Sequence, residues 1–141
     1  MTTALMSAEP PSGAVYLDSS AIVKLVVREP ETAALIAFLA PWQTRVTSAL
    51  ARVEVVRAVR PHGDLATARA ATLVDDLNLL ALDDPLLDAA AAIDANRLRS
   101  LDAIHIASAQ QLEGELGALV SYDERMLTAA RALGVPVSSP R

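Results

Sequence analysis

The chain has 141 residues, 52% of them hydrophobic, and a formal net charge of −5. This length and apolar content are sufficient for one domain with a packed core. The absence of cysteine excludes disulfides, zinc–thiolate sites and cysteine nucleophiles. The acidic balance argues against a protein that holds nucleic acid by its overall charge, so that any such contact must be local.

The expected domain organisation is simple. We predict a flexible N-terminal arm over residues 1–13, a single domain over residues 14–138 and a short C-terminal tail over residues 139–141. The arm has neither a basic start nor a sustained apolar core, and no apolar run approaches the ~20 residues that would span a bilayer. We therefore expect a cytoplasmic protein that makes no contact with membranes.

Short apolar runs alternate with helical patterns along the domain. In chain order, we first predict a strand at 15–17, a helix opened by Asp18 or by Ser19-Ser20, a helix at 31–39 and a strand at 45–47. We then predict a helix from a cap at Thr47 or Ser48 to 59, a helix capped by Asp64, a strand at 79–82, and a helix with Asp84 as its cap and Pro85 at its first position. The last predicted elements are a helix at 101–112 capped by Ser100, a strand at 118–121, a helix at 124–133 and a strand at 135–137. Pro136 places the last strand at a sheet edge. The alternation predicts an α/β fold with a mostly parallel sheet covered on both faces.

Four acidic residues occur where strands end or helices begin, and they lie tens of residues apart: Asp18, Glu54, Asp102 and Asp123. Ligands of parallel α/β sheets collect outside the carboxyl ends of the strands, which is where Asp18 and Asp123 fall. Two carboxylates about 4 Å apart repel by about 4 kcal/mol at an effective dielectric of about 20. A bound divalent cation would relieve that repulsion.

Each acid also has an ordinary explanation when it is taken singly. Asp18 can cap the helix that follows it, and Asp102 and Asp123 can complement the positive ends of their helices. Glu54 is harder to explain, because its helix face carries Leu50 and Ala58, which prefer the interior. Its ordinary partner would be Arg57, three positions later.

Carboxylates without cysteine suit Mg²⁺ or Mn²⁺, and such an ion can activate a water for phosphodiester hydrolysis. His105 shares a helix face with Asp102, which suggests a general base. A histidine between Ile104 and Ile106 is, however, more often structural.

At these residues the chain resembles the PIN-domain family, and within it the VapC-type toxins of toxin–antitoxin pairs. The matching segments are Tyr16 to Ala21, Glu54 to Ala58, Leu98 to Ala109 and Ser121 to Arg125, and the third is the most specific. The resemblance implies a PIN-like three-layer α/β/α sandwich with a short central sheet of four to five strands.

The resemblance also implies a function and a set of site residues. The metal-binding acids of the family map onto Asp18, Glu54, Asp102 and Asp123, with the hydroxyls of Ser19 and Ser121 beside them. It implies Mg²⁺- or Mn²⁺-dependent cleavage of RNA by an activated water, a homodimer, and inhibition by a small cognate VapB-type antitoxin. The high apolar fraction fits a groove for an antitoxin helix or a dimer partner.

Three arginines, Arg28, Arg99 and Arg125, could contact the RNA backbone, although surface charges without such a role explain them equally well. The competing functions are a catalytically idle binding module of the same fold and an aspartate-based phosphatase. The phosphatase needs a second aspartate two positions after the first, where this chain has Ser20. A phosphoacceptor signalling domain needs an acidic pair and a suitably placed lysine, and Lys24 is the single lysine.

Overall fold

The computed structural model describes residues 11–95 and 98–141, so the expected arm lies mostly outside the described residues. The strands are β1 (Ala14–Leu17), β2 (Thr44–Ser48), β3 (Asn78–Leu80), β4 (Leu116–Val120) and β5 (Val137–Ser138). The α-helices are α2 (Ser19–Val26), α3 (Thr32–Leu39), α4 (Ala51–Val59), α5 (Asp64–Asp75), α6 (Asp84–Ala91), α7 (Ser100–Gln110) and α8 (Glu124–Ala132).

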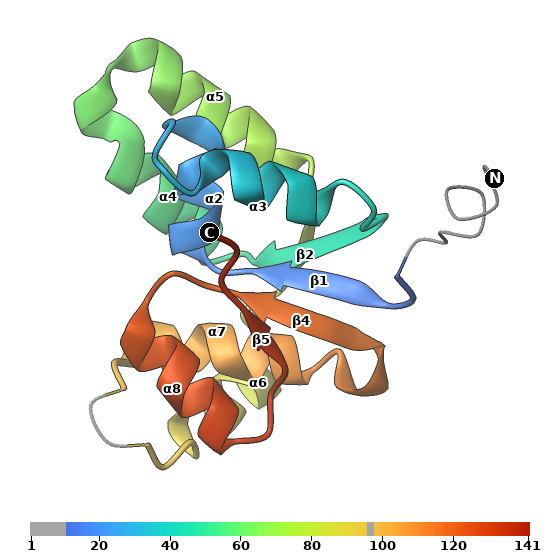
Figure 1. The fold of residues 1–141 in the computed structure, drawn as a ribbon. Helices are drawn as coiled ribbons and strands as arrows, with labels where there is room; N and C mark the ends of the chain where they lie inside the picture. The colour runs from blue at the N-terminus through green and yellow to red at the C-terminus, as the bar shows by residue number, and fades with distance from the viewer. Residues whose placement is uncertain (1–10, 96–97) are drawn as a thin grey trace, which may run out of the picture.

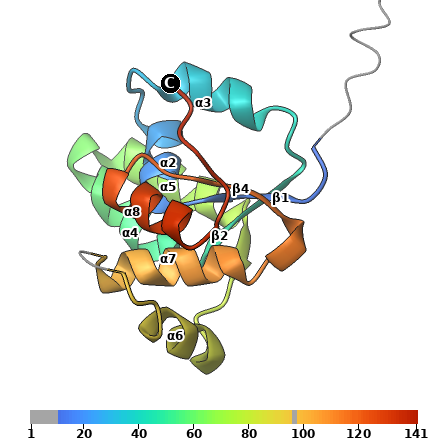
Figure 2. The same cartoon turned by 60° about the horizontal axis from the view of Figure 1, so that its bottom comes forward.

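The five strands form one parallel sheet in the order β3-β2-β1-β4-β5. Helices α2, α3, α4 and α5 lie on one side of the sheet and α6, α7 and α8 on the other (Figure 1). Helix α6 packs on the outer side of α7 rather than on the sheet (Figure 2). The predicted three-layer α/β/α sandwich is therefore confirmed. None of the helices in the described part of the chain has the length and apolarity to cross a membrane.

Strand β1 is the centre of the molecule, and all four of its residues are buried. Side chains alternate between the faces of a strand, so that Val15 and Leu17 enter the core beneath α2 to α5 while Ala14 and Tyr16 enter the core beneath α7 and α8. A strand buried on both faces reads as an apolar run without polar alternation, which is why the sequence identifies it clearly.

Several predicted caps are wrong by one or two residues. Strand β2 continues through Ser48, so Thr47 and Ser48 are buried in the sheet and α4 begins after Leu50, which forms no side-chain cap. Asp83 rather than Asp84 caps α6, because its carboxylate accepts a hydrogen bond from the Leu86 amide. Strand β3 ends at Leu80, earlier than predicted.

The two other capping predictions fail in the same way. Asp64 and Ser100 are the first residues of α5 and α7, and their caps are Gly63 and Arg99. Neither of these two caps has a side-chain oxygen to offer, so capping chemistry could not locate them in the sequence.

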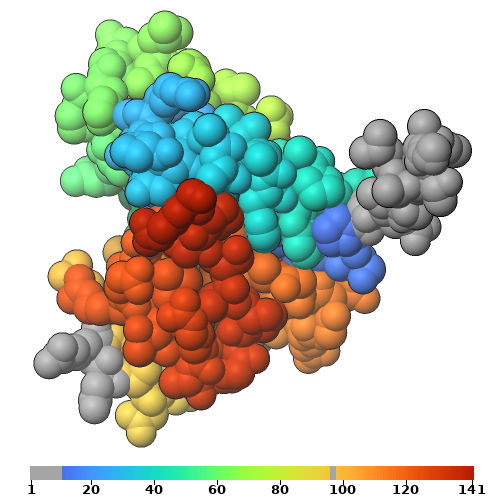
Figure 3. Space-filling model, viewed as in Figure 1, coloured from blue at the N-terminus to red at the C-terminus, as the bar shows by residue number. Residues whose placement is uncertain are grey.

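The C-terminal tail continues beyond β5 and lies against the start of α3 (Figure 3). The Tyr122 hydroxyl donates a hydrogen bond to the carbonyl oxygen of Pro140 at 2.7 Å, and a guanidinium nitrogen of Arg141 lies 3.5 Å from a Glu31 carboxylate oxygen. The Arg141 guanidinium also lies over the Tyr122 ring, 5.7 Å from its centroid.

Gly13 sets the entry into β1. Its φ is 84°, and a Cβ at this position would collide with the backbone carbonyl oxygen of Glu115. The register between β1 and β4 shifts at the adjoining Ala14/Val15 step. Close approach of two backbones therefore requires glycine here.

We expect Gly13→Ala to destabilise the fold more than Gly63→Ala. Gly63 also has a positive φ, 104°, but open space surrounds the position of its missing Cβ. Both variants introduce backbone strain, and only Gly13→Ala adds a collision, for which we expect a further loss of about 1–3 kcal/mol. Urea unfolding of the two variants measures the difference, and equal losses would contradict the assigned role of Gly13.

Candidate functional site

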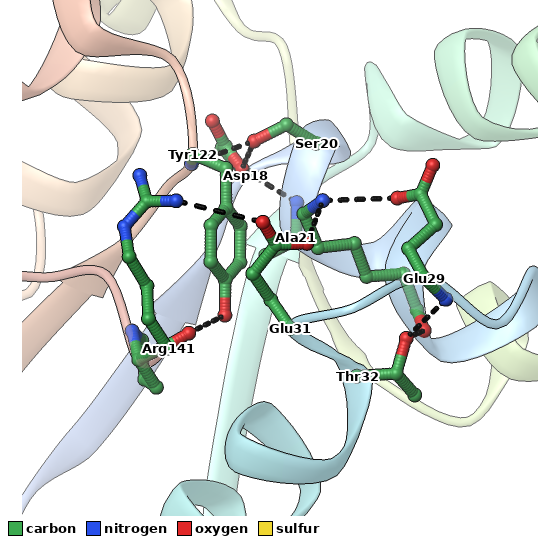
Figure 4. A network of polar contacts seen from close by, with 10 residues as sticks. Asp18, Ser20, Ala21, Glu29, Glu31, Thr32, Tyr122 and Arg141 are labelled. Atoms are coloured by element: carbon green, nitrogen blue, oxygen red, sulfur yellow. Dashed lines mark hydrogen bonds and ion pairs between the residues drawn. The ribbon is translucent and has the colours of Figure 1, made fainter.

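Asp18 leaves the carboxyl end of β1 and is the N-cap of α2. One carboxylate oxygen, Oδ1, accepts hydrogen bonds from the Ala21 amide at 2.9 Å and from the Ser20 hydroxyl at 2.7 Å (Figure 4). The residue is only 2% exposed. Burial raises the pKa of Asp18, while nearby His105 and hydrogen bonds from Ser121, Ser20 and the Ala21 amide act in the opposite direction.

Asp123 reaches the same edge of the sheet because β4 is the neighbour of β1. Leu17 and Val120 pair at the ends of these strands, and the Asp18 amide donates to the Val120 carbonyl oxygen at 3.1 Å. Asp123 caps α8, and its Oδ1 accepts from the amides of Arg125 and Met126. Helix capping thus accounts for one carboxylate oxygen of each aspartate. The sequence had predicted capping as one explanation of Asp18.

The loop before Asp123 is tied to the start of α2. The Tyr122 amide donates to the Ser20 hydroxyl oxygen at 3.0 Å, and that same hydroxyl donates to Asp18 (Figure 4). The Asp123 amide donates to the hydroxyl oxygen of Ser121, which is fully buried. These contacts fix the relative position of two loops that the sequence separates by about a hundred residues. The role of Ser20 was not predicted.

Asp102 approaches the edge from the opposite helical layer, in the first turn of α7. Its side chain is half-buried, and its pKa is raised by burial and by the charges of Asp123 and Asp18, against the lowering effect of His105. Asp102 therefore lies within range of the charges of both Asp123 and Asp18. Within the described residues, none of the three forms an ion pair with lysine or arginine.

Glu54 differs from the environment predicted for it. Its side chain is 24% exposed and Ala58 on the same face is exposed, so the face is not an interior one. Glu54 pairs with His105 rather than with Arg57: its Oε1 lies 2.7 Å from His105 Nε2 and accepts from the Ser19 hydroxyl at 2.6 Å. Burial alone would raise the pKa of Glu54, yet these hydrogen bonds lower it overall.

His105 is buried, with 2% of its surface exposed, and both ring nitrogens are used. Nδ1 lies 2.7 Å from the hydroxyl oxygen of Tyr16, on the opposite side of the ring from Glu54. The sequence analysis noted His105 as structural or catalytic but missed Tyr16 as its partner. The signal was a tyrosine inside an otherwise aliphatic buried strand, since a buried phenol requires a hydrogen-bond partner.

A divalent cation is the kind of ligand that carboxylates at this edge could hold. Among the described residues, no group of three or more carboxylates and imidazoles is drawn together closely enough to form a complete metal site. The chemistry of the donors nevertheless fits one. Burial raises the pKa of Asp18, and burial together with the charges of Asp123 and Asp18 raises the pKa of Asp102. None of the three aspartates has a lysine or arginine partner in the described part of the chain. Hard oxygen donors of this kind suit Mg²⁺ or Mn²⁺, which retain several waters.

The three arginines lie at different distances from this edge, and all are exposed. Arg99 and Arg125 are within three residues of Asp102 and Asp123 in the chain, at the starts of α7 and α8. Arg28 follows α2 at its far end, and a helix of this length separates it from Asp18 by about 12 Å.

The fold and this edge define an α/β protein that collects acidic side chains where its parallel strands end. Comparison with known proteins identifies its relatives. The PIN domain family matches residues 15–132. Ribonuclease VapC46 of Mycobacterium tuberculosis is 50% identical over 127 residues, which cover 90% of this chain and 98% of the relative. The chain therefore belongs to the PIN-domain family, among the VapC proteins.

Solved structures agree with this assignment at the level of the fold. The crystal structure of VapC20 of Mycobacterium tuberculosis, a toxin that cleaves the sarcin–ricin loop, superposes with a TM-score of 0.72 at 17% identity and covers 89% of this chain and 99% of its own. A toxin–antitoxin complex from Klebsiella pneumoniae gives a TM-score of 0.68 at 18% identity, with 90% and 98% covered.

Mutual repulsion at this edge predicts that Asp102→Asn stabilises the metal-free protein. The pKa of Asp102 is raised on folding, so the ionised carboxylate penalises the folded state above that pKa, and the penalty disappears as the pH falls through it. Because the group is half-exposed, we expect a gain below about 1 kcal/mol, or about 2–4 °C in Tm, at neutral pH.

Thermal unfolding in EDTA at neutral and at acidic pH measures this gain, with Asp88→Asn on the exposed side of α6 as the matched control. The gain should shrink on acidification. A Tm lower than that of the wild type at neutral pH would contradict the repulsion.

Proposed function

We propose that this protein is a ribonuclease toxin of a toxin–antitoxin pair, and that it hydrolyses RNA phosphodiester bonds with Mg²⁺ or Mn²⁺. The observation that carries the proposal is a group of aspartates from three separate segments, in which Asp102 lies within range of the charges of Asp18 and Asp123 and none of the three pairs with a described lysine or arginine. The 50% identity to a relative named as a VapC ribonuclease supports the reaction class.

In this proposal Asp18, Asp102 and Asp123 hold the ion, and Glu54 holds a water of its shell or orients the attacking water. The bound ion lowers the pKa of water and neutralises charge that develops on the phosphate. Capping fixes one oxygen of Asp18 and one of Asp123, so their side chains are preorganised before any ion binds. The lowered pKa of Glu54 keeps its carboxylate ionised at neutral pH, as a hydrogen-bond acceptor for water.

The hydroxyls of Ser19 and Ser121 support this arrangement from beside the acids. The Ser19 hydroxyl donates to Glu54, and that of Ser121 accepts from the Asp123 amide. Arg99 and Arg125 supply exposed guanidinium groups that suit RNA phosphates near the acids. Arg28, at the other end of α2, would contact the RNA backbone farther from the cleaved bond.

The test of this proposal is cleavage of total cellular RNA by the purified protein, with and without EDTA, followed by mapping of the cleaved ends. We expect cleavage that EDTA abolishes and Mg²⁺ or Mn²⁺ restores. Asp18→Asn and Asp123→Asn should each reduce the rate by at least about 100-fold, since even the outer partners of metal ligands are worth 10- to 100-fold. Asp88→Asn serves as the control and should retain the wild-type rate.

Wild-type rates in the Asp18→Asn variant would contradict the catalytic assignment. RNA binding without cleavage, unchanged by any ion, would instead favour the catalytically idle binding module.

We also propose a cytoplasmic homodimer that a small VapB-type antitoxin inhibits. The support is the overall similarity to a toxin–antitoxin complex and the large side chains left exposed in the described residues, including Ile36, Val53 and Leu65.

Light scattering of the purified protein should give twice the mass of the 141-residue chain. Addition of the product of a short adjacent reading frame should give a larger complex and suppress RNA cleavage. A monomer that binds no such product would contradict this part of the proposal.

A further inference from the structure

A continuous chain of hydrogen bonds joins the centre of the sheet to the candidate active site. Tyr16 Oη lies 2.7 Å from His105 Nδ1, His105 Nε2 lies 2.7 Å from Glu54 Oε1, and the Ser19 hydroxyl donates to the same Oε1 at 2.6 Å. The Ser19 hydroxyl oxygen also lies 3.2 Å from Nε2. Side chains of three helices, α2, α4 and α7, thus meet at one carboxylate oxygen.

This series of hydrogen bonds runs from one helical layer of the molecule to the other. Tyr16 points from β1 into the core beneath α7 and α8, whereas Glu54 belongs to α4 on the opposite side (Figure 1). His105 lies on α7 and spans the two. Its hydrogen bond to Glu54 is therefore a polar connection between the two helical layers near the edge where the aspartates gather.

The positions of the hydrogens decide which group donates and which accepts in each of these hydrogen bonds. Burial raises the pKa of the Tyr16 phenol, so its oxygen carries a proton. That proton is donated to Nδ1 when the neutral imidazole carries its own hydrogen on Nε2. Nε2–H then donates to Glu54 Oε1, which an ionised carboxylate can accept. Every donor in this series of hydrogen bonds is then matched with an acceptor.

The consequence is a carboxylate with one oxygen fixed and the other available. Oε1 accepts from His105 and Ser19, and no hydrogen bond within the described residues engages Oε2. A glutamate has three rotatable bonds and would otherwise sample several positions at a surface where it is 24% exposed. Two donors on one oxygen restrict it to the orientation that leaves Oε2 free.

We infer that Tyr16 and His105 are positioning residues: the Tyr16 hydroxyl holds the His105 ring so that Nε2 faces Glu54, and His105 thereby orients Glu54 for its role in catalysis. The functional part of this inference rests on the proposed nuclease activity. Neither residue touches the reacting atoms, so their effect passes through the Glu54 carboxylate.

Two substitutions of His105 separate positioning from packing. The amide nitrogen of glutamine can occupy the place of Nε2, so His105→Gln retains a donor for Glu54. Asparagine reaches only the place of Nδ1, so His105→Asn retains a partner for Tyr16 and loses the donor. Tyr16→Phe removes the hydroxyl that holds the ring. Tyr122→Phe is the matched control, because its hydroxyl bonds the Pro140 carbonyl oxygen outside this chain of hydrogen bonds.

The first readout is independent of RNA cleavage. Nitrogen-15 NMR of the metal-free protein should show a hydrogen on Nε2 of His105, with the exposed His62 as an internal reference. Tyr16→Phe should produce a mixture of tautomers, and Tyr122→Phe should leave the spectrum unchanged. An Nδ1–H tautomer in the wild type, or an unchanged ring in Tyr16→Phe, would overturn the inference.

The second readout is function in variants that retain a cooperative thermal transition. We expect His105→Asn to lose about 10- to 100-fold in Mn²⁺ affinity by calorimetry or in kcat, and His105→Gln to recover most of that loss. Equal losses in the two variants would assign His105 to packing alone. If the wild type cleaves no RNA, the proposed nuclease fails, while the tautomer and the Mn²⁺ affinities still decide the positioning role.

Discussion

The features of this site follow from the gathering of like charges at one edge of a parallel sheet. Strands β1 and β4 are neighbours, so the loops that leave them carry Asp18 and Asp123 to one place, and α7 brings Asp102 from the opposite layer. Burial raises the pKa values of Asp18 and Asp102, and the charges of Asp123 and Asp18 raise that of Asp102 further. The fold keeps these carboxylates together at a cost in stability, as sites of function commonly do.

The fold meets this cost with rigid surroundings. Asp18 and Asp123 each use one oxygen to cap a helix, and Ser20 links the two loops through a shared hydroxyl. Glu54 is held differently, by donors from the opposite layer and from the start of α2. Backbone amides and neutral hydroxyls supply most of these contacts, so the negative charge at the edge is oriented without being neutralised. An edge of this kind remains available to a cation.

Local interactions specify the helices and strands well enough to be predicted from the sequence, whereas the exact ends of these elements are less well predicted. The buried strand β1 reads as an apolar run, and the alternation of strands and helices predicted a parallel α/β sandwich, which the structure confirms. The caps of α4, α5 and α7 were missed because Leu50, Gly63 and Arg99 make no side-chain capping bond. The partner of Glu54 was also wrong, since Arg57 is near in the chain whereas His105 is near only in space.

The linear pattern of residues specifies where apolar runs and helical periods fall, and that four acids occur at the ends of such elements. These properties depend on interactions within a few residues, which a linear pattern records. The tertiary structure alone decided that His105 reaches Glu54 past β1, that Tyr16 lies behind it, and that Ser20 joins two distant loops. Such contacts depend on strand order and on the packing of both helical layers, and no local spacing encodes them.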